Sequence, residues 1–378
     1  MYMKQSRYLK SNIDQIMQKK MVFIGGPRQV GKTTLSLSYL TPPSAKNPQY
    51  LNWDNPTDQK TILKNEISFA SKVCVFDEIH KYKKWRSLIK GIYDKNFEDH
   101  QFIVAGSARL DHFRKGGDSL LGRYRYFRLH PFTISELNAS SSDIQALLQF
   151  GGFPELYFSQ NTKEHKLWLN ERSYRLVRDD IKDLTAIKET SLIALLIELL
   201  PSRVGSLLSL NSLSEDLQVS QPSINRWLNE LEHLYYCYRI SPYGSTKIRA
   251  IKKNQKLYLW DWSEVSNPGT RFENMVAGHL LKMCHFLDDT EGDKFELRYL
   301  RDTDGHEVDF VVLKNKKALF AVECKTGESS VSKSINYFKE RLDIPEYYQV
   351  HLGMKDFGSV KNGRVLPFKT FCKEKNLV

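Results

Sequence analysis

The sequence predicts an α/β fold, with two α/β units and a helical region between them. Three observations carry this prediction. Short apolar runs alternate with helical stretches over residues 21–132, which is typical of a mostly parallel sheet with crossover helices. Strand signals then vanish over residues 133–203, where the period is helical. Strand patterns return between residues 256 and 327, so a second α/β unit follows, separate from the first.

A charged, amphipathic helix is expected over residues 8–20, and the apolar run MVFIGG predicts the first strand. The helical stretch KTTLSLSYL follows and stops near two consecutive prolines. Further strands, the first of them a weaker candidate, are predicted within residues 50–55, 72–80, 101–110 and 123–132. Helical patterns such as WRSLIKGIYDKNF lie between them.

Composition bounds the class of protein. The chain has 378 residues, of which 41% are apolar and 12% aromatic, so two or three folded globular domains are expected. The amino terminus is polar, without a secretory pattern, and the richest apolar run (residues 192–200) is too short to cross a bilayer. Five scattered cysteines without a C-x-x-C pair argue against a disulfide framework or a zinc site. We therefore expect a cytoplasmic protein with no membrane partner.

The formal net charge is +12, from 56 lysines and arginines against 44 acidic residues. Such an excess favours polyanionic partners such as nucleic acid. A merely basic surface explains the same number equally well, so composition leaves both interpretations open.

A glycine-rich motif follows the first strand. GPRQVGKT matches G-x-x-x-x-G-K-[ST], with a strand before it and a helix after it, as the motif requires. The glycines let backbone N–H groups face phosphate oxygens, the lysine reaches the β- and γ-phosphates, and the threonine hydroxyl ligates Mg²⁺. The predicted ATP-binding residues are Gly26, Pro27, Arg28, Gln29, Val30, Gly31, Lys32, Thr33 and Thr34.

Two carboxylates end a later apolar strand. In VCVFDE, Asp77 is expected to hold Mg²⁺ and Glu78 to polarise the attacking water. The alternative is a strand whose acidic end makes surface contacts. Beside a good P-loop, the pair indicates ATP hydrolysis rather than binding alone. Ser107 is a candidate for orienting the water, and Arg123 for reaching a neighbouring subunit's ATP as an arginine finger, with Arg109 as its competitor. A structural role is an equal alternative for each arginine.

The stretch SLSEDLQVSQPSINRWLNELEHLYYCYRI predicts a helix-turn-helix followed by a β-wing. Its second helix would present Gln221, Ser223, Asn225 and Arg226 to DNA, or the motif would serve as a packing or subunit-contact module. A basic connector over residues 247–256 would bind phosphates or act as a solvated linker. Its basic residues are Lys247, Arg249, Lys252, Lys253 and Lys256.

At these residues the chain resembles the AAA-type ATPases of bacteria and archaea that carry an uncharacterised carboxy-terminal domain similar to PD-(D/E)XK nucleases. The likeness covers nearly the whole length. Its marks are GPRQVGKTT, VFDEIHK, AGSARL, LLGRY, LHPFTISEL, GGFPE, VSQPSINRWLNELE, KLYLWDWSEVSNPGTRFENMVAGHLL, EVDFVV and VECKTG.

The resemblance implies four domains. They are an AAA+ P-loop core (1–135), a helical lid (136–205), a winged helix (206–248) and a restriction-endonuclease-like domain (249–378). It also implies a ring-forming homo-oligomer, with Arg123 acting in trans. One departure weakens the predicted sensor role, because many AAA+ proteins have Asn where this chain has Ser107.

The last strands carry a second group of polar residues. In EVDFVV and VECKTG, residues two apart share one strand face, so neighbouring strands would bring Asp309, Glu323 and Lys325 together. This is the nuclease arrangement, in which Asp309 and Glu323 would hold Mg²⁺ or Mn²⁺ while Lys325 positions the attacking water. Glu273 matches the acidic residue that such folds often add from an early helix. The alternative is a solvated, cross-strand charge pattern.

Together these observations predict a Mg²⁺-dependent ATPase that interacts with DNA. Its end domain would cut or grip nucleic acid under control of the nucleotide state. The alternative hypothesis is an ATP-switched scaffold or sensor whose nuclease-like domain is inactive and binds a protein partner.

Overall fold

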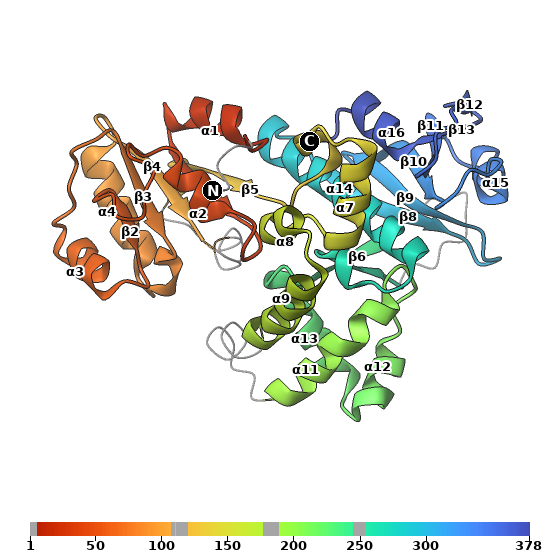
Figure 1. Ribbon diagram of the computed structural model, residues 1–378, viewed down its shortest axis with the longest axis horizontal. Coiled ribbons are helices and arrows are strands. Elements are labelled where there is room, and N and C mark those ends of the chain that lie inside the picture. The colour runs from red at the N-terminus through yellow and green to blue at the C-terminus, as the bar shows by residue number, and fades with distance from the viewer. Residues whose placement is uncertain (1–5, 107–109, 111–119, 177–188, 245–253) are drawn as a thin grey trace. The chain divides into compact units, whose positions relative to one another are not determined.

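The structure is a computed structural model that describes residues 6–106, 110, 120–176, 189–244 and 254–378 (Figure 1). The chain separates into two compact units, residues 1–131 and 132–378, which are described one at a time. The first contains a five-stranded sheet and the second an eight-stranded sheet. The predicted α/β class, with a parallel sheet first and a separate second sheet, is confirmed.

In the first unit every pair of neighbouring strands is parallel, in the order β2-β3-β4-β1-β5. Strands β1 and β4 are buried at every position, which requires cover on both faces of the sheet. On one face, helices α3 and α4 add Ile62 and Trp85 to a core that contains Phe23 of β1. The elements are α1 (Lys10–Met17), β1 (Met21–Gly25), α2 (Lys32–Leu37), β2 (Tyr50–Asn52), α3 (Pro56–Lys64), β3 (Val73–Asp77), α4 (Trp85–Asn96), β4 (Gln101–Ala105) and β5 (Tyr124–Arg128).

The second unit begins with helices. They are α6 (Ile134–Leu137), α7 (Ser141–Phe150), α8 (Pro154–Ser159), α9 (Thr162–Arg175), α11 (Thr190–Leu199), α12 (Leu210–Leu217) and α13 (Gln221–His233). Local capping explains several of their starts. Ser140 and Asp143 form a reciprocal capping box at α7, and the Ser220 side chain accepts a hydrogen bond from the Ser223 N–H at α13. Pro222 lies at the start of α13, where its missing N–H costs nothing.

The sheet of the second unit is mixed, in the order β12-β13-β11-β10-β9-β8-β6-β7. Strands β8, β9 and β10 form an antiparallel meander, whereas β10, β11 and β13 are parallel. The elements are β6 (Cys237–Pro242), β7 (Lys256–Leu259), α14 (Pro268–Glu291), β8 (Phe295–Arg301), β9 (Glu307–Lys314), β10 (Lys317–Cys324), α15 (Lys333–Lys339), β11 (Glu346–His351), β12 (Phe357–Ser359), β13 (Gly363–Pro367) and α16 (Phe368–Glu374).

The strands after the helix pair α12–α13 belong to this large sheet. Strand β6 pairs antiparallel with β7 and parallel with β8, so the expected wing and the end domain share one sheet. Residues 132–378 accordingly form one compact unit. The boundaries proposed at residues 205 and 248 within this unit stay predictions.

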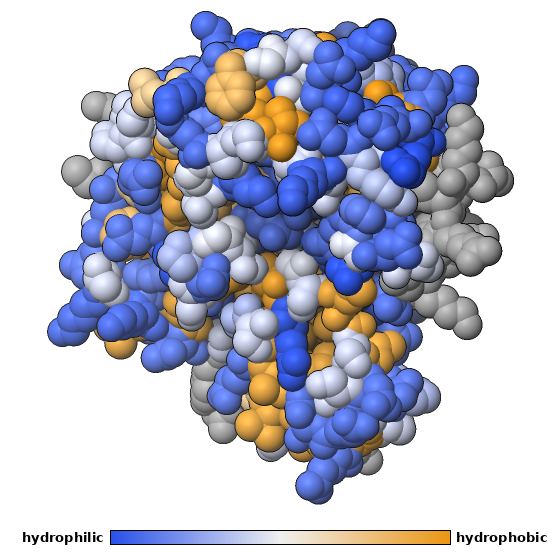
Figure 2. All heavy atoms as spheres, turned by 90° about the vertical axis from the view of Figure 1, so that its right-hand side faces the viewer, coloured by the Kyte–Doolittle hydropathy of each residue, from blue (hydrophilic) through white to orange (hydrophobic). Residues whose placement is uncertain are grey.

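The surface mixes polar and apolar side chains. Figure 2 shows one face on which hydrophilic side chains predominate and hydrophobic ones gather in smaller groups between them. Among the described residues, the most exposed large apolar side chains are Leu121 and Met354. None of the helices in the described residues has the length and apolar character needed to span a bilayer.

Candidate functional site

The P-loop connects the end of β1 to the start of α2. Three of its residues, Gly26, Gln29 and Gly31, have positive φ angles of 144°, 61° and 97°. A Cβ atom at Gly26 would lie 2.3 Å from the backbone oxygen of Leu129, so only glycine fits there. The sequence therefore forms the tight turn that lets a backbone approach phosphate oxygens closely.

Lys32 begins α2 and is 7% exposed. Its ammonium donates hydrogen bonds to the backbone oxygens of Gly26 and Pro27, at 3.0 and 2.6 Å. The side chain thus folds back over the loop, and its charge lies where the phosphates of a bound nucleotide are expected. Among the other predicted nucleotide-binding residues, Val30 is buried and Arg28, Gln29 and Thr34 are exposed.

Thr33 and Asp77 meet at the carboxyl end of the sheet. The Thr33 hydroxyl donates to Oδ2 of Asp77 at 2.7 Å, and Asp77 is 3% exposed at the end of β3. Burial raises the pKa of Asp77 above its usual range, and the hydrogen bonds from Thr33 and Tyr50 oppose that rise. A threonine hydroxyl and a carboxylate are hard oxygen ligands of the kind that Mg²⁺ takes, so these two residues fit the predicted metal.

Tyr50 is a member of this site that sequence reasoning missed. Its hydroxyl donates to the same Oδ2 of Asp77 at 2.8 Å. Burial and the Asp77 charge raise the pKa of Tyr50, which keeps the hydroxyl protonated as a donor. The only sequence signal was the position of Tyr50 at the start of the weak strand that became β2, next to β3.

Arg7 is a second missed residue. It is 8% exposed, and its guanidinium donates to the backbone oxygens of Val30 in the P-loop (2.7 Å) and His130 (2.5 Å). The arginine therefore ties the loop to the segment that follows β5. A single arginine near the amino terminus gave no pattern that would have indicated this contact.

Glu78 follows Asp77 with a left-handed backbone (φ 56°), and its N–H donates to the Ala105 oxygen at 2.9 Å. Its carboxylate lies 3.4 Å from the Lys81 ammonium and 3.7 Å from Nε2 of His80, and the side chain is 20% exposed. The sharp turn separates the directions of two consecutive acidic side chains. One is thereby held by Thr33, and the other stays partly open to solvent.

Of the two further residues predicted for this unit, the structure describes Arg123 but not Ser107. Ser107 and its neighbour Arg109 lie outside the described residues. Arg123 donates to both carboxylate oxygens of Asp94, at 2.6 and 3.2 Å, and its backbone oxygen accepts from the Met21 N–H. Arg123 thus lies at the amino end of β1, about 16 Å of strand away from the P-loop at roughly 3.3 Å per residue. An arginine side chain cannot span that length. Arg123 could therefore act as an arginine finger only on ATP bound to another copy of the chain.

In the second unit, the predicted residues Glu273, Asp309 and Glu323 lie together with Glu307, which was not predicted as a site residue; we call these four the carboxylate cluster. Oδ2 of Asp309 on β9 accepts from the Cys324 N–H on β10 at 2.8 Å, which joins the two strands at this point. Burial and the Asp309 charge raise the pKa of Glu323 to about 7, although the Lys325 ammonium lies only 2.8 Å away.

Glu273 comes from α14. The Tyr258 hydroxyl of β7 donates to its Oε1 at 2.7 Å. Burial and the neighbouring Asp309 charge raise the pKa of Glu273 to about 8. All four predicted residues (Glu273, Asp309, Glu323 and Lys325) are thus joined by contacts or electrostatic interactions in this part of the unit.

Lys256 is the residue that sequence reasoning placed wrongly. The sequence places it in a basic connector, as a phosphate contact or a solvated linker residue, and both interpretations are wrong because it is 1% exposed. Its Nζ lies 2.5 Å from Glu307, 3.6 Å from Glu273 and 3.9 Å from Asp309. The other connector residues, Lys247, Arg249, Lys252 and Lys253, lie outside the described residues.

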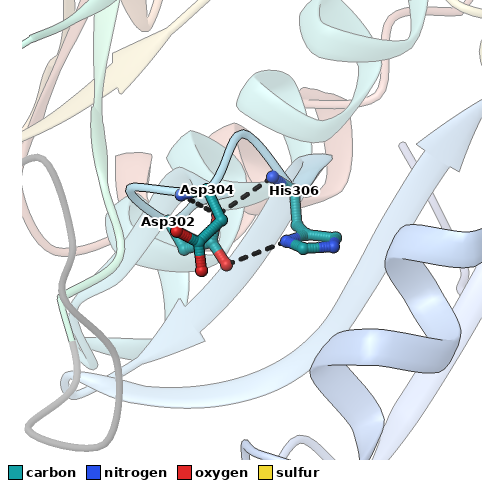
Figure 3. A group of neighbouring side chains, drawn as sticks. All are labelled: Asp302, Asp304 and His306. Atoms are coloured by element: carbon teal, nitrogen blue, oxygen red, sulfur yellow. Dashed lines mark hydrogen bonds and ion pairs between the residues drawn. The ribbon is translucent and has the colours of Figure 1, made fainter.

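A third group lies in the turn between β8 and β9. Asp302, Asp304 and His306 each place a potential ligand atom within 4.8 Å of the others (Figure 3). The same carboxylate of Asp302 accepts from the N–H groups of Asp304 and His306 at 2.9 Å each, and from the His306 ring at 3.1 Å. The His306 ring also stacks on Tyr337. The three residues therefore lie close together because Asp302 stabilises the turn by accepting these hydrogen bonds.

The helix pair α12–α13 supplies the last predicted site. Arg226 is 54% exposed and lies 3.8 Å from Glu189. Asn225 and Gln221 make contacts within the chain: Asn225 accepts from Arg239 at 3.0 Å, and Gln221 donates to Asn211 at 2.9 Å. The Ser223 hydroxyl lies 3.0 Å from that of Ser220. Of the four predicted DNA contacts, Arg226 is the one that carries a charge, and its side chain is exposed.

Three family models match consecutive parts of the chain. Residues 18–138 match an AAA domain, residues 141–265 match a domain of unknown function (DUF8612), and residues 268–371 match another domain of unknown function (DUF4143). The first match covers both the P-loop and Asp77. Together with their geometry, it supports an AAA-type P-loop ATPase domain that binds and hydrolyses ATP.

Curated relatives are distant. Uncharacterized proteins of Mycobacterium bovis and Mycobacterium tuberculosis are each 23% identical over 243 residues, which cover 64% of this chain and 54% of theirs. The chain thus spans about half the length of these relatives. An uncharacterized protein of Haemophilus influenzae is 22% identical over 338 residues, covering 79% of this chain and 80% of its own.

Two solved structures illustrate the structural neighbours. The Thermotoga maritima RuvB Holliday junction branch migration motor is 16% identical, with a TM-score of 0.32 over 66% of this chain and 90% of that one. The Aeropyrum pernix Orc1 protein in complex with DNA is 14% identical, with a TM-score of 0.35 over 73% of this chain and 95% of that one.

Proposed function

We propose that the chain is a Mg²⁺-dependent ATPase whose nucleotide state controls DNA binding by the second unit. The observation that carries the ATPase part is the 2.7 Å contact between the Thr33 hydroxyl and Asp77 Oδ2, beside a P-loop of matching geometry. It joins a residue of the P-loop helix to the end of β3, where an ATPase needs its metal ligands.

Each residue of this site has a distinct role. The N–H groups of the P-loop and the Lys32 ammonium bind the phosphates, and Thr33 and Asp77 hold the metal. Mg²⁺, when bound, neutralises charge on the β- and γ-phosphates. Glu78 is partly exposed and therefore accessible to water, whose attack on the γ-phosphate it would orient and assist as a base.

ATP turnover by the full chain tests this proposal. Lys32→Ala removes the phosphate-binding charge, and we expect phosphate release to fall at least about 100-fold, a loss typical of preorganised electrostatic groups. Lys46→Ala is the matched control, because Lys46 is exposed and precedes β2. A Lys32→Ala variant that turns over ATP at the wild-type rate would exclude this site.

For the second unit we propose that DNA is gripped by the face of α13 that carries Arg226. The net charge of +12 and the exposed guanidinium support this proposal. Duplex DNA binding, measured by fluorescence anisotropy at rising salt, tests it, because affinity for phosphates falls steeply with ionic strength. Absence of binding at low salt would favour a scaffold with a protein partner instead.

The second candidate function is metal-dependent DNA cleavage at the carboxylate cluster. The observation that favours it is the convergence of Glu273, Asp309, Glu323 and Lys325. The test compares wild-type cleavage with that of Asp309→Ala and Lys325→Ala, in Mg²⁺ or Mn²⁺ and with or without ATP. Cleavage that both substitutions abolish would establish the cutting activity.

A homo-oligomer with Arg123 acting in trans remains a separate prediction.

A further inference from the structure

The carboxylate cluster contains a positive charge from its own chain at its centre. The Lys256 ammonium lies within 4 Å of carboxylate oxygens from Glu307, Glu273 and Asp309, and its side chain is 1% exposed. The Tyr299 ring lies 5.6 Å from the same nitrogen. Ion pairs with carboxylates offset the desolvation of a buried ammonium.

The backbone fixes Lys256 in this place from two sides. It pairs with Ile240 across the β6–β7 ladder and forms an isolated antiparallel bridge with Leu207. The adjacent Gln255 oxygen accepts from the Leu208 N–H at 2.8 Å. The side chain therefore starts from a rigid point, and retracting it into solvent would break contacts with three carboxylates.

Every carboxylate of the cluster lies near a cation of the chain, although Oε2 of Glu323 is buried without a hydrogen-bond partner among the described residues. Glu307 also lies 2.6 Å from Arg301, and Glu323 lies 2.8 Å from Lys325, while Lys256 serves Glu273 and Asp309. A divalent ion held by Asp309 and Glu323, the two predicted metal ligands, would need oxygen ligands at about 2.0–2.6 Å. Oδ1 of Asp309 lies 3.9 Å from the Lys256 ammonium, so such an ion would lie near the buried cation, and like charges that close repel strongly away from water. The buried lysine therefore disfavours the metal expected for a nuclease site.

We propose that Lys256 is a built-in cation that takes the place of a divalent metal ion in the carboxylate cluster, so that the native second unit grips DNA without cutting it. The cluster is then a latent metal site, closed by one side chain from β7. The inference refines the proposed function by deciding between gripping and cutting. The exclusion of metal by Lys256 rests on contacts within the second unit alone, so a failure of the ATPase or DNA-binding proposal would leave that part standing, whereas the gripping of DNA rests on the proposed function.

Mn²⁺ binding to the nucleotide-free full chain, followed by electron paramagnetic resonance, tests the proposal. Four proteins are compared: wild type, Asp309→Asn, Lys256→Met and the double variant. Any metal held by Thr33 and Asp77 contributes equally to all four. We expect wild type and Asp309→Asn to bind the same amount, Lys256→Met to bind one additional Mn²⁺ per chain, and the double variant to lose that addition. Lys317→Met, at an exposed lysine that begins β10, is the matched control and should bind as wild type does.

Two results would overturn the proposal. One is a wild type that binds one Mn²⁺ more than Asp309→Asn, since the native cluster would then hold metal beside the lysine. The other is a folded Lys256→Met variant that binds no more Mn²⁺ than wild type. If Lys256→Met does not fold, the comparison of wild type with Asp309→Asn decides alone: equal binding supports the proposal and unequal binding refutes it.

Discussion

The Tyr50 hydroxyl donates a hydrogen bond to Asp77 at 2.8 Å, on the same carboxylate oxygen that accepts from Thr33. Two hydroxyls from different elements thus converge on one oxygen at the end of β3. One belongs to a predicted metal ligand, while the other comes from β2 and fixes the orientation of the carboxylate. Support of this kind from outside the ligand set tunes metal affinity in many sites.

The first prediction concerns Tyr50. Tyr50→Phe removes the donor, so the Asp77 carboxylate is held less firmly and its pKa rises further. We expect the Mg²⁺ concentration for half-maximal ATP turnover to rise about 10-fold, with the rate largely restored at saturating Mg²⁺. A Mg²⁺ titration of ATPase activity measures this. Tyr39→Phe is the control, since Tyr39 donates to the Lys10 oxygen and not to Asp77. Equal Mg²⁺ dependence in wild type and Tyr50→Phe would refute the proposed role of Tyr50 in orienting the Asp77 carboxylate.

The second prediction concerns Arg226 and DNA. Arg226→Ala removes an exposed cation from α13, so binding to duplex DNA should weaken at all sequences, and the slope of log affinity against log salt should fall by about 1. Arg175→Ala provides the control, because Arg175 is equally exposed but lies on α9, outside the helix pair α12–α13. An unchanged salt slope in Arg226→Ala would place the DNA contact elsewhere.

The third prediction concerns pH and the second unit. His279 accepts a hydrogen bond from the Ile134 N–H at 3.0 Å, and its other ring nitrogen lies 2.7 Å from the Met275 oxygen, which satisfies a neutral ring. Burial lowers the pKa of His279 from 6.5 to about 3. Since the folded state therefore binds fewer protons than the unfolded state between these values, the His279 contribution to the free energy of unfolding is complete above the upper value. It declines as pH falls toward the lower one.

Thermal unfolding midpoints between pH 7 and pH 4.5 measure this dependence. The midpoint of the transition for residues 132–378 should fall less in His279→Gln than in wild type, because the glutamine does not titrate. His233→Gln, at a histidine whose side chain is 46% exposed, should behave as wild type does. Parallel pH profiles for wild type and His279→Gln would contradict the assignment of this pH dependence to His279.

The P-loop site was largely predictable because its chemistry lies in short, continuous motifs. Gly26, Lys32, Thr33 and Asp77 follow from two strand ends, and parallel neighbours bring such ends to one edge of a sheet. Tyr50 was not predictable, since it comes from a weak strand whose side chain has no motif of its own. The same holds for the elements after β10, where α15, β11, β12, β13 and α16 follow short runs without a clear period.

The carboxylate cluster shows more clearly what the sequence alone cannot predict. The pairs Glu307–Asp309 and Glu323–Lys325 could be placed on strand faces from their spacing, because alternate residues of a strand share a face. The burial of Lys256 could not be predicted, because a lysine among other basic residues is expected to be solvated. Only the ladder between β6 and β7 carries it into the interior. Burial of one charge thus depends on a tertiary contact that no local pattern records.

The fourth prediction concerns Glu78, and it tests the account most directly. Glu78→Gln keeps the size of the side chain but removes the base, while Lys32, Thr33 and Asp77 remain to bind ATP and Mg²⁺. ATP binding and phosphate release are measured on the same preparations. We predict near-normal ATP affinity in Glu78→Gln with turnover lowered at least about 100-fold. A Glu78→Gln variant that hydrolyses ATP at the wild-type rate would contradict the assignment of this site.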